Sequence, residues 1–216
     1  QISNINKIIS GDNKSTLNKI EKIYKKIIKK KIIKVSSIKQ AESSKIIENV
    51  QRDINIALMN EFSNVFYKLK LDFKEILEAA NTKWNFVPFK PGLVGGHCIG
   101  VDPYYLIFKS KQSGFIPDLI KTSREINNSV PKFVVNKVKN EIDLLPSNNT
   151  YDILVLGYTF KENCSDIRNS KIFDLIKMMR NLKIKILLHD PYADTHNIKL
   201  NYNEKKVEWK NIKKKY

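Results

Sequence analysis

The sequence predicts a mixed α/β chain, in which a central all-α domain with one long helix precedes the incomplete start of a doubly wound α/β domain. Two observations lead to this fold class. Apolar residues recur with a helical period over about 30 residues that include neither Gly nor Pro. Further on, two short β-branched runs flank an amphipathic segment, which is the pattern of a β-α-β unit in a parallel sheet.

The first 36 residues are expected to hold one helix and one strand. Residues 14–30 combine a lysine-rich face with apolar residues at helical spacing, namely Leu17, Ile20, Ile23, Tyr24, Ile27 and Ile28. Residues 31–36 are short and rich in β-branched side chains, which predicts a strand.

The long helix is predicted to begin near Ser37, with Gln40 as its capping-box partner, and to end near Leu69. Its apolar stripe consists of Ile46, Ile47, Val50, Ile54, Ala57, Leu58, Phe62, Val65, Phe66 and Leu69. A helix of about 30 residues spans roughly 45 Å, which is longer than a small domain needs. We therefore expect it to form a homodimer as well as to pack on its own core.

Shorter elements follow. Asp72 is expected to open a helix that ends near Ala80, and Asp102 to cap a helix that Gly114 ends. Two further helices are expected at 117–128 and 131–145, then a loop at 146–150 that serves as the domain boundary. The β-α-β unit comprises a strand at 152–157, a helix at 169–182 and a strand at 183–189.

The basic composition does not by itself indicate a nucleic-acid function. The net charge of +17 arises with 35 Lys, 30 Ile and 23 Asn, three residue types whose A/T-rich codons a biased genome inflates together. Only four of the 39 basic residues are Arg, which nucleic-acid surfaces favour for its bidentate fork. We expect non-specific polyanion binding at low salt and no specific nucleic-acid partner.

Other function classes are also disfavoured. No apolar run approaches the roughly 18 residues of a membrane span, so no membrane insertion is expected, and no signal peptide is recognisable. The two cysteines cannot form a disulfide framework, which favours a reducing cytoplasm. The three His lack the spacing of metal ligands, so no metal site is expected. Because the chain begins with Gln, we expect it to be a piece of a longer protein.

Residues 81–102 differ from the rest because they hold four of the seven glycines and one of the two cysteines. Such a glycine cluster marks backbone that turns tightly or approaches a ligand closely. Cys98 stands four residues before the helix expected at Asp102, and a helix N-terminus favours a thiolate. Cys98 is therefore a candidate nucleophile, although a buried structural cysteine in a turn fits the spacing equally well.

Other polar residues have two interpretations each. Lys45 and Asn49 lie one turn apart on the long helix, where solvated side chains are the commoner case. Lys161 and Arg168 flank the loop between strand and helix, where α/β sheets bind phosphates, although an ordinary polar loop is the more frequent explanation. Asp190 follows the second strand, so it is either a ribose-binding acid or part of an Asp-Pro turn.

Three blocks of the sequence resemble one family. The run from Asn81 to Leu106, which contains PFKPGLVGGHCIGVDPYYL, resembles the UDP-glucose/GDP-mannose dehydrogenases, and most closely the branch that acts on UDP-N-acetylglucosamine, -galactosamine or -mannosamine. Residues 41–61 and 156–170 extend the resemblance over nearly the whole chain.

The resemblance implies a cytoplasmic enzyme that oxidises the C6 alcohol of a UDP-sugar to a carboxylate for polysaccharide precursors, passing two hydrides in turn to NAD. It also implies three domains. Residues 1–36 would be the remnant of an NAD-binding Rossmann domain, 37–146 the central helical dimerisation and catalytic domain, and 147–216 a partial, Rossmann-like UDP-binding domain.

The resemblance assigns roles by position. Cys98 would be the nucleophile that forms a thiohemiacetal and then a thioester, Lys45 would stabilise the oxyanion, and Asn49 with Asp102 would orient the hydrolytic water. Arg168 would bind the NAD phosphates. The residues implied to bind the UDP-sugar are Lys90, Gly92, Gly95, Gly96 and Lys161.

The chain departs from this family in extent. It contains no Gly-x-Gly-x-x-Gly fingerprint, so we expect the isolated chain to be inactive and not to bind NAD. The alternative function is that of a truncated, catalytically inactive helical dimerisation scaffold.

Overall fold

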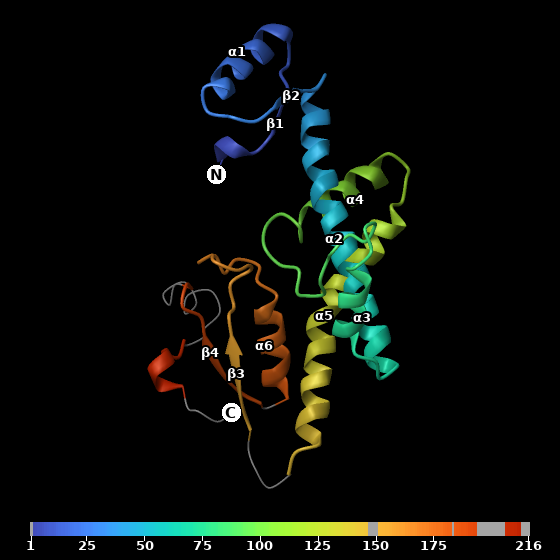
Figure 1. The fold of residues 1–216 in the computed structure, drawn as a ribbon, viewed down its shortest axis with the longest axis vertical. Helices are drawn as coiled ribbons and strands as arrows, with labels where there is room; N and C mark the ends of the chain where they lie inside the picture. The colour runs from blue at the N-terminus through green and yellow to red at the C-terminus, as the bar shows by residue number, and fades with distance from the viewer. Residues whose placement is uncertain (1, 147–150, 183, 194–205, 213–216) are drawn as a thin grey trace. The chain divides into compact units, whose positions relative to one another are not determined.

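A computed structural model describes residues 2–146, 151–182, 184–193 and 206–212 (Figure 1). The chain divides into two compact units, Gln1–Gln51 and Arg52–Tyr216, and the division falls within the long helix α2 (Ile38–Lys68). No helix in the described ranges is both long and apolar enough to cross a membrane.

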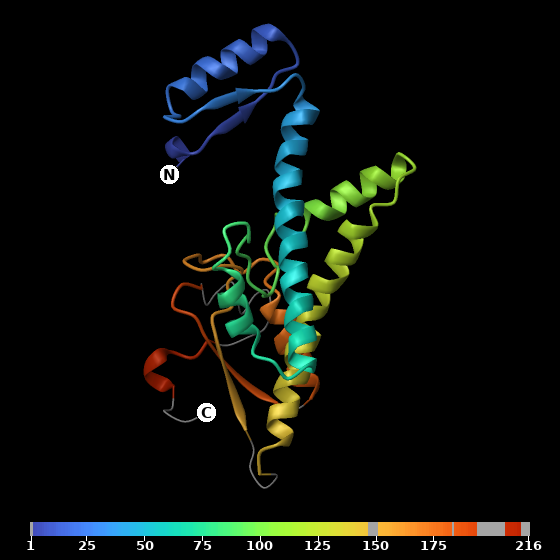
Figure 2. The same ribbon diagram turned by 45° about the vertical axis from the view of Figure 1, so that its right-hand side comes forward.

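The first unit is a small β-α-β arrangement. Strands β1 (Lys7–Ile9) and β2 (Ile32–Lys34) pair in parallel, and α1 (Lys14–Lys25) connects them across one face (Figure 2). The side chain of Asn13 caps α1 by accepting a hydrogen bond of 2.9 Å from the Thr16 amide. The expected helix and strand are confirmed, whereas β1 was not predicted because three residues are too few to show a period.

The predicted start of α2 is confirmed. The Gln40 amide donates a hydrogen bond of 3.2 Å to Ser37 Oγ, which supplies an acceptor to one of the otherwise unpaired first N–H groups of the helix. After α2, Asp72 caps α3 (Phe73–Ala80) by accepting a hydrogen bond of 2.8 Å from the Lys74 amide. Both helices therefore begin where the sequence places a capping side chain.

The cap predicted at Asp102 is wrong. Helix α4 (Asp102–Gln112) has Val101 at its N-cap position, and Asp102 is its first helical residue. The carbonyl of Cys98 accepts hydrogen bonds from the amides of Val101 and Asp102, at 3.0 and 2.8 Å. A backbone turn thus pairs the first amides, and Pro103 has no amide to pair, so a side-chain cap is not needed.

The prediction of two helices around Pro131 is also wrong, because one helix, α5 (Asp118–Asp143), continues through that residue. A proline inside a helix removes one hydrogen bond. Val130, Pro131 and Val135 are all buried, so packing of this face compensates for the lost bond.

Beyond α5, strand β3 (Asp152–Leu156), helix α6 (Ile172–Asn181) and strand β4 (Lys185–His189) form the predicted β-α-β unit. The strands pair in parallel from Asp152 opposite Lys185 to Leu156 opposite His189. Figure 1 shows α6 between this sheet and α5. The central helices and this unit confirm the predicted fold class.

A shared core joins α5 to α6, since Val135 of α5 packs with Leu175 and Met179 of α6. A second core under the sheet consists of Tyr158, Ile167, Phe173, Ile176, Leu188 and Ala193. Most of the loop expected to separate two domains, 147–150, lies outside the described residues. The division into domains at 36 and 146 therefore stays a prediction.

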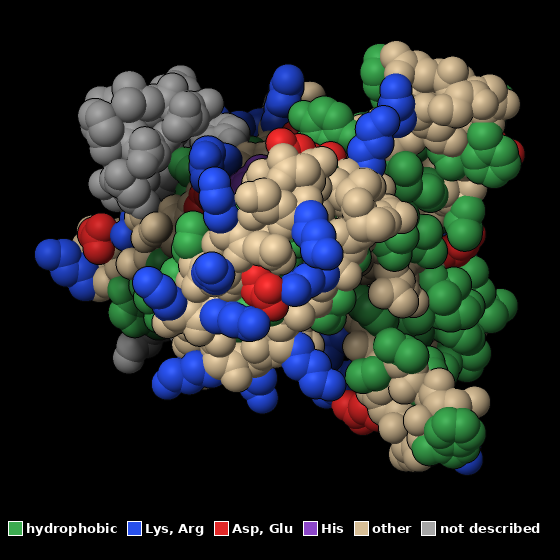
Figure 3. All heavy atoms as spheres, turned by 90° about the horizontal axis from the view of Figure 1, so that it is seen from above, with side chains coloured by type: hydrophobic (Ala, Val, Ile, Leu, Met, Phe, Trp, Pro, Cys, Tyr) green, Lys and Arg blue, Asp and Glu red, His purple; other side chains and the backbone are tan. Residues whose placement is uncertain are grey.

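Hydrophobic side chains are also exposed in the second unit, and Figure 3 shows such side chains gathered on the right of its view. Among the exposed hydrophobic residues of this unit, Leu58, Phe62 and Val65 follow one another along α2 at helical spacing, and Leu69 comes directly after the end of the helix. Others lie on α4 and around the start of α5, namely Tyr104, Tyr105, Phe108, Phe115, Ile116 and Leu119.

Candidate functional site

The glycine-rich segment 91–98, called the glycine loop below, is held at two points. Near its start, the Gly92 amide donates to Asn60 Oδ1 at 2.8 Å, and Asn60 Nδ2 donates to the Gly92 carbonyl at 3.0 Å. Near its end, the Gly96 amide donates to the Asn169 carbonyl at 3.1 Å, and Asn169 Nδ2 donates to the Gly96 carbonyl at 2.7 Å. Each asparagine therefore binds both backbone groups of one glycine.

Two of the loop's glycines are required by close packing. A Cβ at Gly95 would lie 2.5 Å from the Asn169 carbonyl oxygen, and one at Gly96 would lie 2.7 Å from the Phe160 ring. Gly96 also has a φ of +80°, which L side chains rarely adopt. The cluster thus marks close approach, as its composition indicates, and the partner seen here is the loop between β3 and α6.

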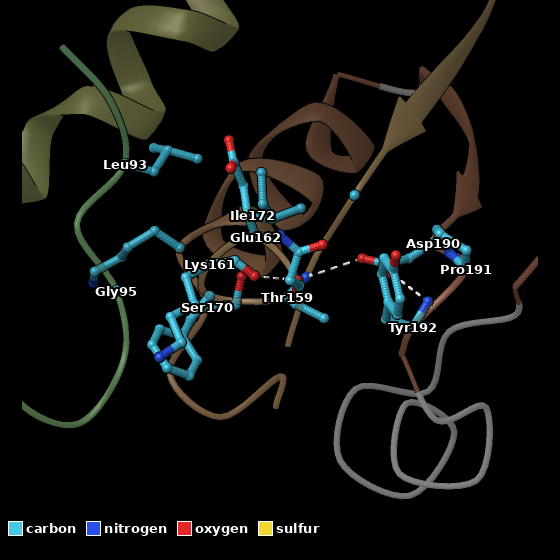
Figure 4. A pocket seen from close by; sticks show the side chains of 14 residues that line it. Leu93, Gly95, Thr159, Lys161, Glu162, Ser170, Ile172, Asp190, Pro191 and Tyr192 are labelled. Atoms are coloured by element: carbon cyan, nitrogen blue, oxygen red, sulfur yellow. Dashed lines mark hydrogen bonds between the residues drawn. The ribbon is translucent and has the colours of Figure 1, made fainter. Parts of the chain in front are cut away.

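A cavity of about 460 Å³ opens beside the glycine loop (Figure 4). Leu93 and Gly95 form one wall, and the rest comes from the β3–α6 loop, the start of α6 and the residues after β4. These further lining residues are Gly157, Thr159, Phe160, Lys161, Glu162, Asn163, Ser170, Lys171, Ile172, Asp190, Pro191 and Tyr192. The cavity lies at the carboxyl ends of two parallel strands, where α/β sheets bind their ligands.

Lys161 and Lys171 supply positive charge to this cavity, which lies next to the N-terminus of α6. Lys161 is exposed, and its Nζ lies 5.3 Å from the centre of the Phe160 ring. Lys171 Nζ forms an ion pair of 3.0 Å with Asp174. The acidic residues Glu162 and Asp190 also line the cavity, so its charge is mixed.

Asp190 is a structural residue of the cavity wall. It is 3% exposed, and its carboxylate accepts hydrogen bonds from the amides of Tyr158, Thr159, Tyr192 and Ala193. Burial by itself would raise the pKa of Asp190, but the four amide donors together hold the pKa below its ordinary value. Of the two interpretations left open by the sequence, the turn describes the observed contacts.

Cys98 is exposed in the turn that leads into α4. The alternative of a buried structural cysteine is therefore wrong. Asp102 begins α4 four residues later, so both residues predicted to be catalytic in this segment lie at one helix start. Cys98 does not line the cavity, but it follows Gly96, whose neighbour Gly95 does.

Arg168 and Asp166 form a bidentate pair in the β3–α6 loop. Arg168 Nε lies 3.0 Å from Asp166 Oδ1, and Nη2 lies 2.6 Å from Oδ2. The hydrogen-bonded guanidinium lowers the pKa of Asp166 to about 2. His97 of the glycine loop also approaches this pair, with its Nδ1 3.8 Å from Asp166 Oδ2.

The other predicted site residues are placed as follows. Lys45 and Asn49 lie one turn apart on the part of α2 that belongs to the first unit. Lys45 Nζ forms an ion pair of 3.0 Å with Glu48, whereas Asn49 is buried. The approach of Lys45 and Asn49 to Cys98 stays a prediction. Lys90 is exposed and is not among the residues that line the cavity.

The buried polar cluster behind Asn60 was not predicted from the sequence. Asn60 Nδ2 also donates to Asn127 Oδ1 at 2.8 Å, and Asn127 Nδ2 donates to Asp53 Oδ1 at 2.7 Å. Asp53 in turn forms a buried ion pair with Arg124. Asp53 and Arg124 are 71 positions apart, so no local pattern joins them. Asn169 was missed for the same reason.

Comparison with known proteins places this site in a family. Residues 39–129 match the central domain, and residues 154–215 the UDP-binding domain, of the UDP-glucose/GDP-mannose dehydrogenase family. The UDP-N-acetyl-D-glucosamine 6-dehydrogenase of Salmonella typhi is 43% identical over 207 residues, which cover 94% of this chain and 48% of that protein. The enzyme of the same name from Pseudomonas aeruginosa is 41% identical over 198 residues, 91% of this chain and 47% of its own length.

A solved structure supports the same relationship. The UDP-D-ManNAc dehydrogenase of Pyrococcus horikoshii is 32% identical and matches with a TM-score of 0.78, over 89% of this chain and 46% of that one. The chain therefore spans about half the length of the curated relatives it matches. The resemblance in the three sequence blocks is confirmed, and the chain belongs to the UDP-glucose/GDP-mannose dehydrogenase family.

Proposed function

We propose that the whole protein is a cytoplasmic, NAD-dependent UDP-sugar 6-dehydrogenase that oxidises the C6 alcohol of a UDP-N-acetylhexosamine to the uronic acid, as a precursor of cell-surface polysaccharide. One observation carries this proposal: the glycine loop that presents the exposed Cys98 also forms a wall of the cavity at the ends of β3 and β4. The match of residues 154–215 to a UDP-binding domain supports UDP as the occupant of that cavity.

The charges of the cavity suit a diphosphate. Lys161 and Lys171 line it, and the positive end of the α6 dipole next to the cavity favours an anion. The buried carboxylate of Asp190 is hydrogen-bonded by four amides, which reduces its repulsion of a phosphate. The remaining wall, formed by the glycine loop with Lys90 beside it, would then enclose the sugar.

We propose the following reaction at Cys98. The thiolate adds to the C6 aldehyde carbon and forms a thiohemiacetal, which keeps the aldehyde from leaving. Loss of a hydride from that carbon gives a thioester, and water then releases the carboxylate and restores the thiolate. We assign stabilisation of the oxyanion to the Lys45 ammonium and orientation of the water to Asn49 and Asp102.

The two oxidations require a hydride acceptor, for which we propose NAD. The described residues do not make a dinucleotide site by themselves. Arg168 is exposed, and Asp166 binds its Nε and Nη2, which leaves Nη1 for a phosphate. The chain has no glycine-rich fingerprint that could hold the rest of the cofactor. We therefore assign most of the NAD site to the remainder of the whole protein.

Binding of UDP by the present chain tests the cavity assignment. Calorimetric titration should detect UDP binding, and Lys161→Ala should weaken it about tenfold, as expected for a lost charge-assisted contact. Lys185→Ala is the matched control, because Lys185 is an exposed lysine of the same sheet that pairs with Asp152 and does not line the cavity. Absence of UDP binding by the unmodified chain would contradict the proposal and favour an inactive scaffold.

A further inference from the structure

We propose that Asn169 is a positioning residue for Cys98. When a nucleoside diphosphate binds in the cavity, Asn169 passes the resulting movement to the glycine loop. The inference rests on the proposed function for the nature of the ligand and for the reactivity of Cys98. It concerns a contact between two loops that are 73 residues apart in sequence.

The first support is the position of Asn169 between the cavity and the thiol. The next three residues, Ser170, Lys171 and Ile172, all line the cavity. On its other side, Asn169 exchanges two hydrogen bonds with Gly96, at 3.1 and 2.7 Å, and Gly96 lies two residues before Cys98. A shift of the start of α6 on ligand binding is therefore passed directly to the backbone that carries Cys98.

The second support is close packing over the same contact. The Asn169 carbonyl oxygen occupies the space that a Cβ of Gly95 would need, and the Phe160 ring occupies that of Gly96. Phe160 also lines the cavity. Because neither glycine has room to move toward this surface, a movement of the β3–α6 loop toward the glycine loop displaces it.

The third support is the backbone of Asn169, whose φ of +53° is in the left-handed region. A non-glycine residue is disfavoured there by about 1 kcal/mol, and asparagine is among the side chains that tolerate it best. Glycine would relieve this strain but would lack the Nδ2 donor to Gly96. The structure thus combines a strained backbone with a side-chain bond that glycine cannot make.

The other end of the loop is attached differently. Asn60, which binds Gly92, projects from α2 and is linked to Asn127 of α5, and neither residue lines the cavity. The loop is therefore attached to the helices through Asn60. It is attached to the cavity side through Asn169, and also through His97, whose ring contacts the Phe160 ring with 5.4 Å between their centres. A ligand that moves the second attachment changes the course of Leu93 to Gly96 and so the position of Cys98.

Two substitutions isolate the side-chain donor. Asn169→Gly keeps the left-handed backbone and the carbonyl that accepts from Gly96. Asn169→Asp keeps the shape and the tolerance for this backbone but has no N–H to donate. Lys70→Gly is the control, because Lys70 has a φ of +56° in an exposed turn far along the chain from both loops.

The readout is the rate of alkylation of Cys98 by iodoacetamide, followed by peptide mass spectrometry with and without saturating UDP. In the unmodified chain and in Lys70→Gly, UDP should slow this reaction about fivefold, the effect expected for one hydrogen bond of ordinary strength. In both Asn169 variants the ratio of the two rates should fall to about one, while the Kd for UDP changes less than about threefold.

The outcomes separate this inference from the proposed function. If UDP binds the unmodified chain without slowing alkylation, or slows it equally in the Asn169 variants, the positioning role is wrong and the UDP cavity stands. If UDP does not bind, the proposed function fails. Amide hydrogen exchange over residues 94–98, measured without ligand, then tests whether Asn169 positions the glycine loop. Exchange about fivefold faster in Asn169→Gly than in Lys70→Gly supports positioning, and equal exchange overturns it.

Discussion

Asp190 illustrates how much a single side chain contributes to this fold. From the sequence, Asp-Pro indicates only that a strand ends, and the acid could equally have served a ribose. The structure shows that both carboxylate oxygens bind backbone amides on either side of the cavity. The role depends on amides 31 and 32 positions away, and no local pattern contains that information.

Asp190→Asn should therefore destabilise the chain. The variant leaves amide donors without an acceptor, which costs about 2–4 kcal/mol at pH 7. Since the folded carboxyl has a pKa below the ordinary 3.8, the stability that it contributes is complete above that value and is lost as the pH falls through the depressed pKa. Urea unfolding from pH 7 to about pH 3 measures the free energy of unfolding of both proteins. The difference between the variant and the wild type should become smaller only at the acid end of this range. A difference that already closes by pH 6 would contradict this assignment.

Substitution of Cys98 tests the chemistry in the whole protein. Cys98→Ala should abolish formation of the uronic acid, because the nucleophile is removed. Cys98→Ser should accumulate a covalent sugar ester, because an alkoxide leaves more slowly than a thiolate. Mass spectrometry with UDP-sugar and NAD detects this adduct. Cys164→Ser is the control and should turn over normally, and normal turnover by Cys98→Ala would show that Cys98 has no catalytic role.

At the level of elements, the sequence predicted best where local chemistry decides. Capping side chains predicted where α2 and α3 begin. The spacing of apolar residues predicted the helix α6 between two paired strands. Prediction from the sequence failed at Pro131, because burial of one helix face outweighed a local rule, and at β1, which is held by pairing with β2. The glycine loop was found from composition, whereas the residues that fix it come from α2 and the β3–α6 loop.

Asn60→Ala should test the attachment of the glycine loop to α2. The substitution leaves both backbone groups of Gly92 and the Asn127 oxygen without their partner, so we expect a loss of about 2–4 kcal/mol in the free energy of unfolding. Asn136→Ala, an exposed asparagine of α5, should change stability by less than about 0.5 kcal/mol. Urea unfolding compares the two, and equal effects would show that the Asn60 bonds contribute nothing specific.

At the scale of the whole molecule, the described chain exposes a stripe of apolar side chains along α2. Leu58, Phe62 and Val65 lie on one face of α2, at intervals of four and three residues. Leu69 extends this face just beyond the end of the helix, where its amide still donates to the Val65 carbonyl at 3.0 Å. Fully burying a side chain of this kind is worth about 1.5–3 kcal/mol. We propose that a second copy of the chain covers this face.

Light scattering at micromolar concentration should therefore give twice the chain mass of 25.1 kDa. Phe62→Glu places a charge in the centre of the stripe and should reduce the measured mass to that of one chain. Ile23→Glu is the control, because Ile23 is an exposed apolar residue on α1 outside the stripe, and it should leave the dimer intact. A mass of 25.1 kDa for the unmodified chain would exclude this dimer.

The contact between the glycine loop and the β3–α6 loop sets a rule for recombining this chain with its relatives. The absent side chains at Gly95 and Gly96 match the Asn169 carbonyl and the Phe160 ring, so the two loops form a matched pair. A chimera with its crossover between residues 99 and 156 separates the pair. It should keep the side-chain hydrogen bond to the Gly96 carbonyl only when the donor carries Asn at position 169, and the ring packing on Gly96 only when the donor carries Phe at position 160. A crossover after residue 171 leaves this pair intact together with the hydrogen bonds between Asn60 and Gly92, so it is the better position for exchanging parts with a relative.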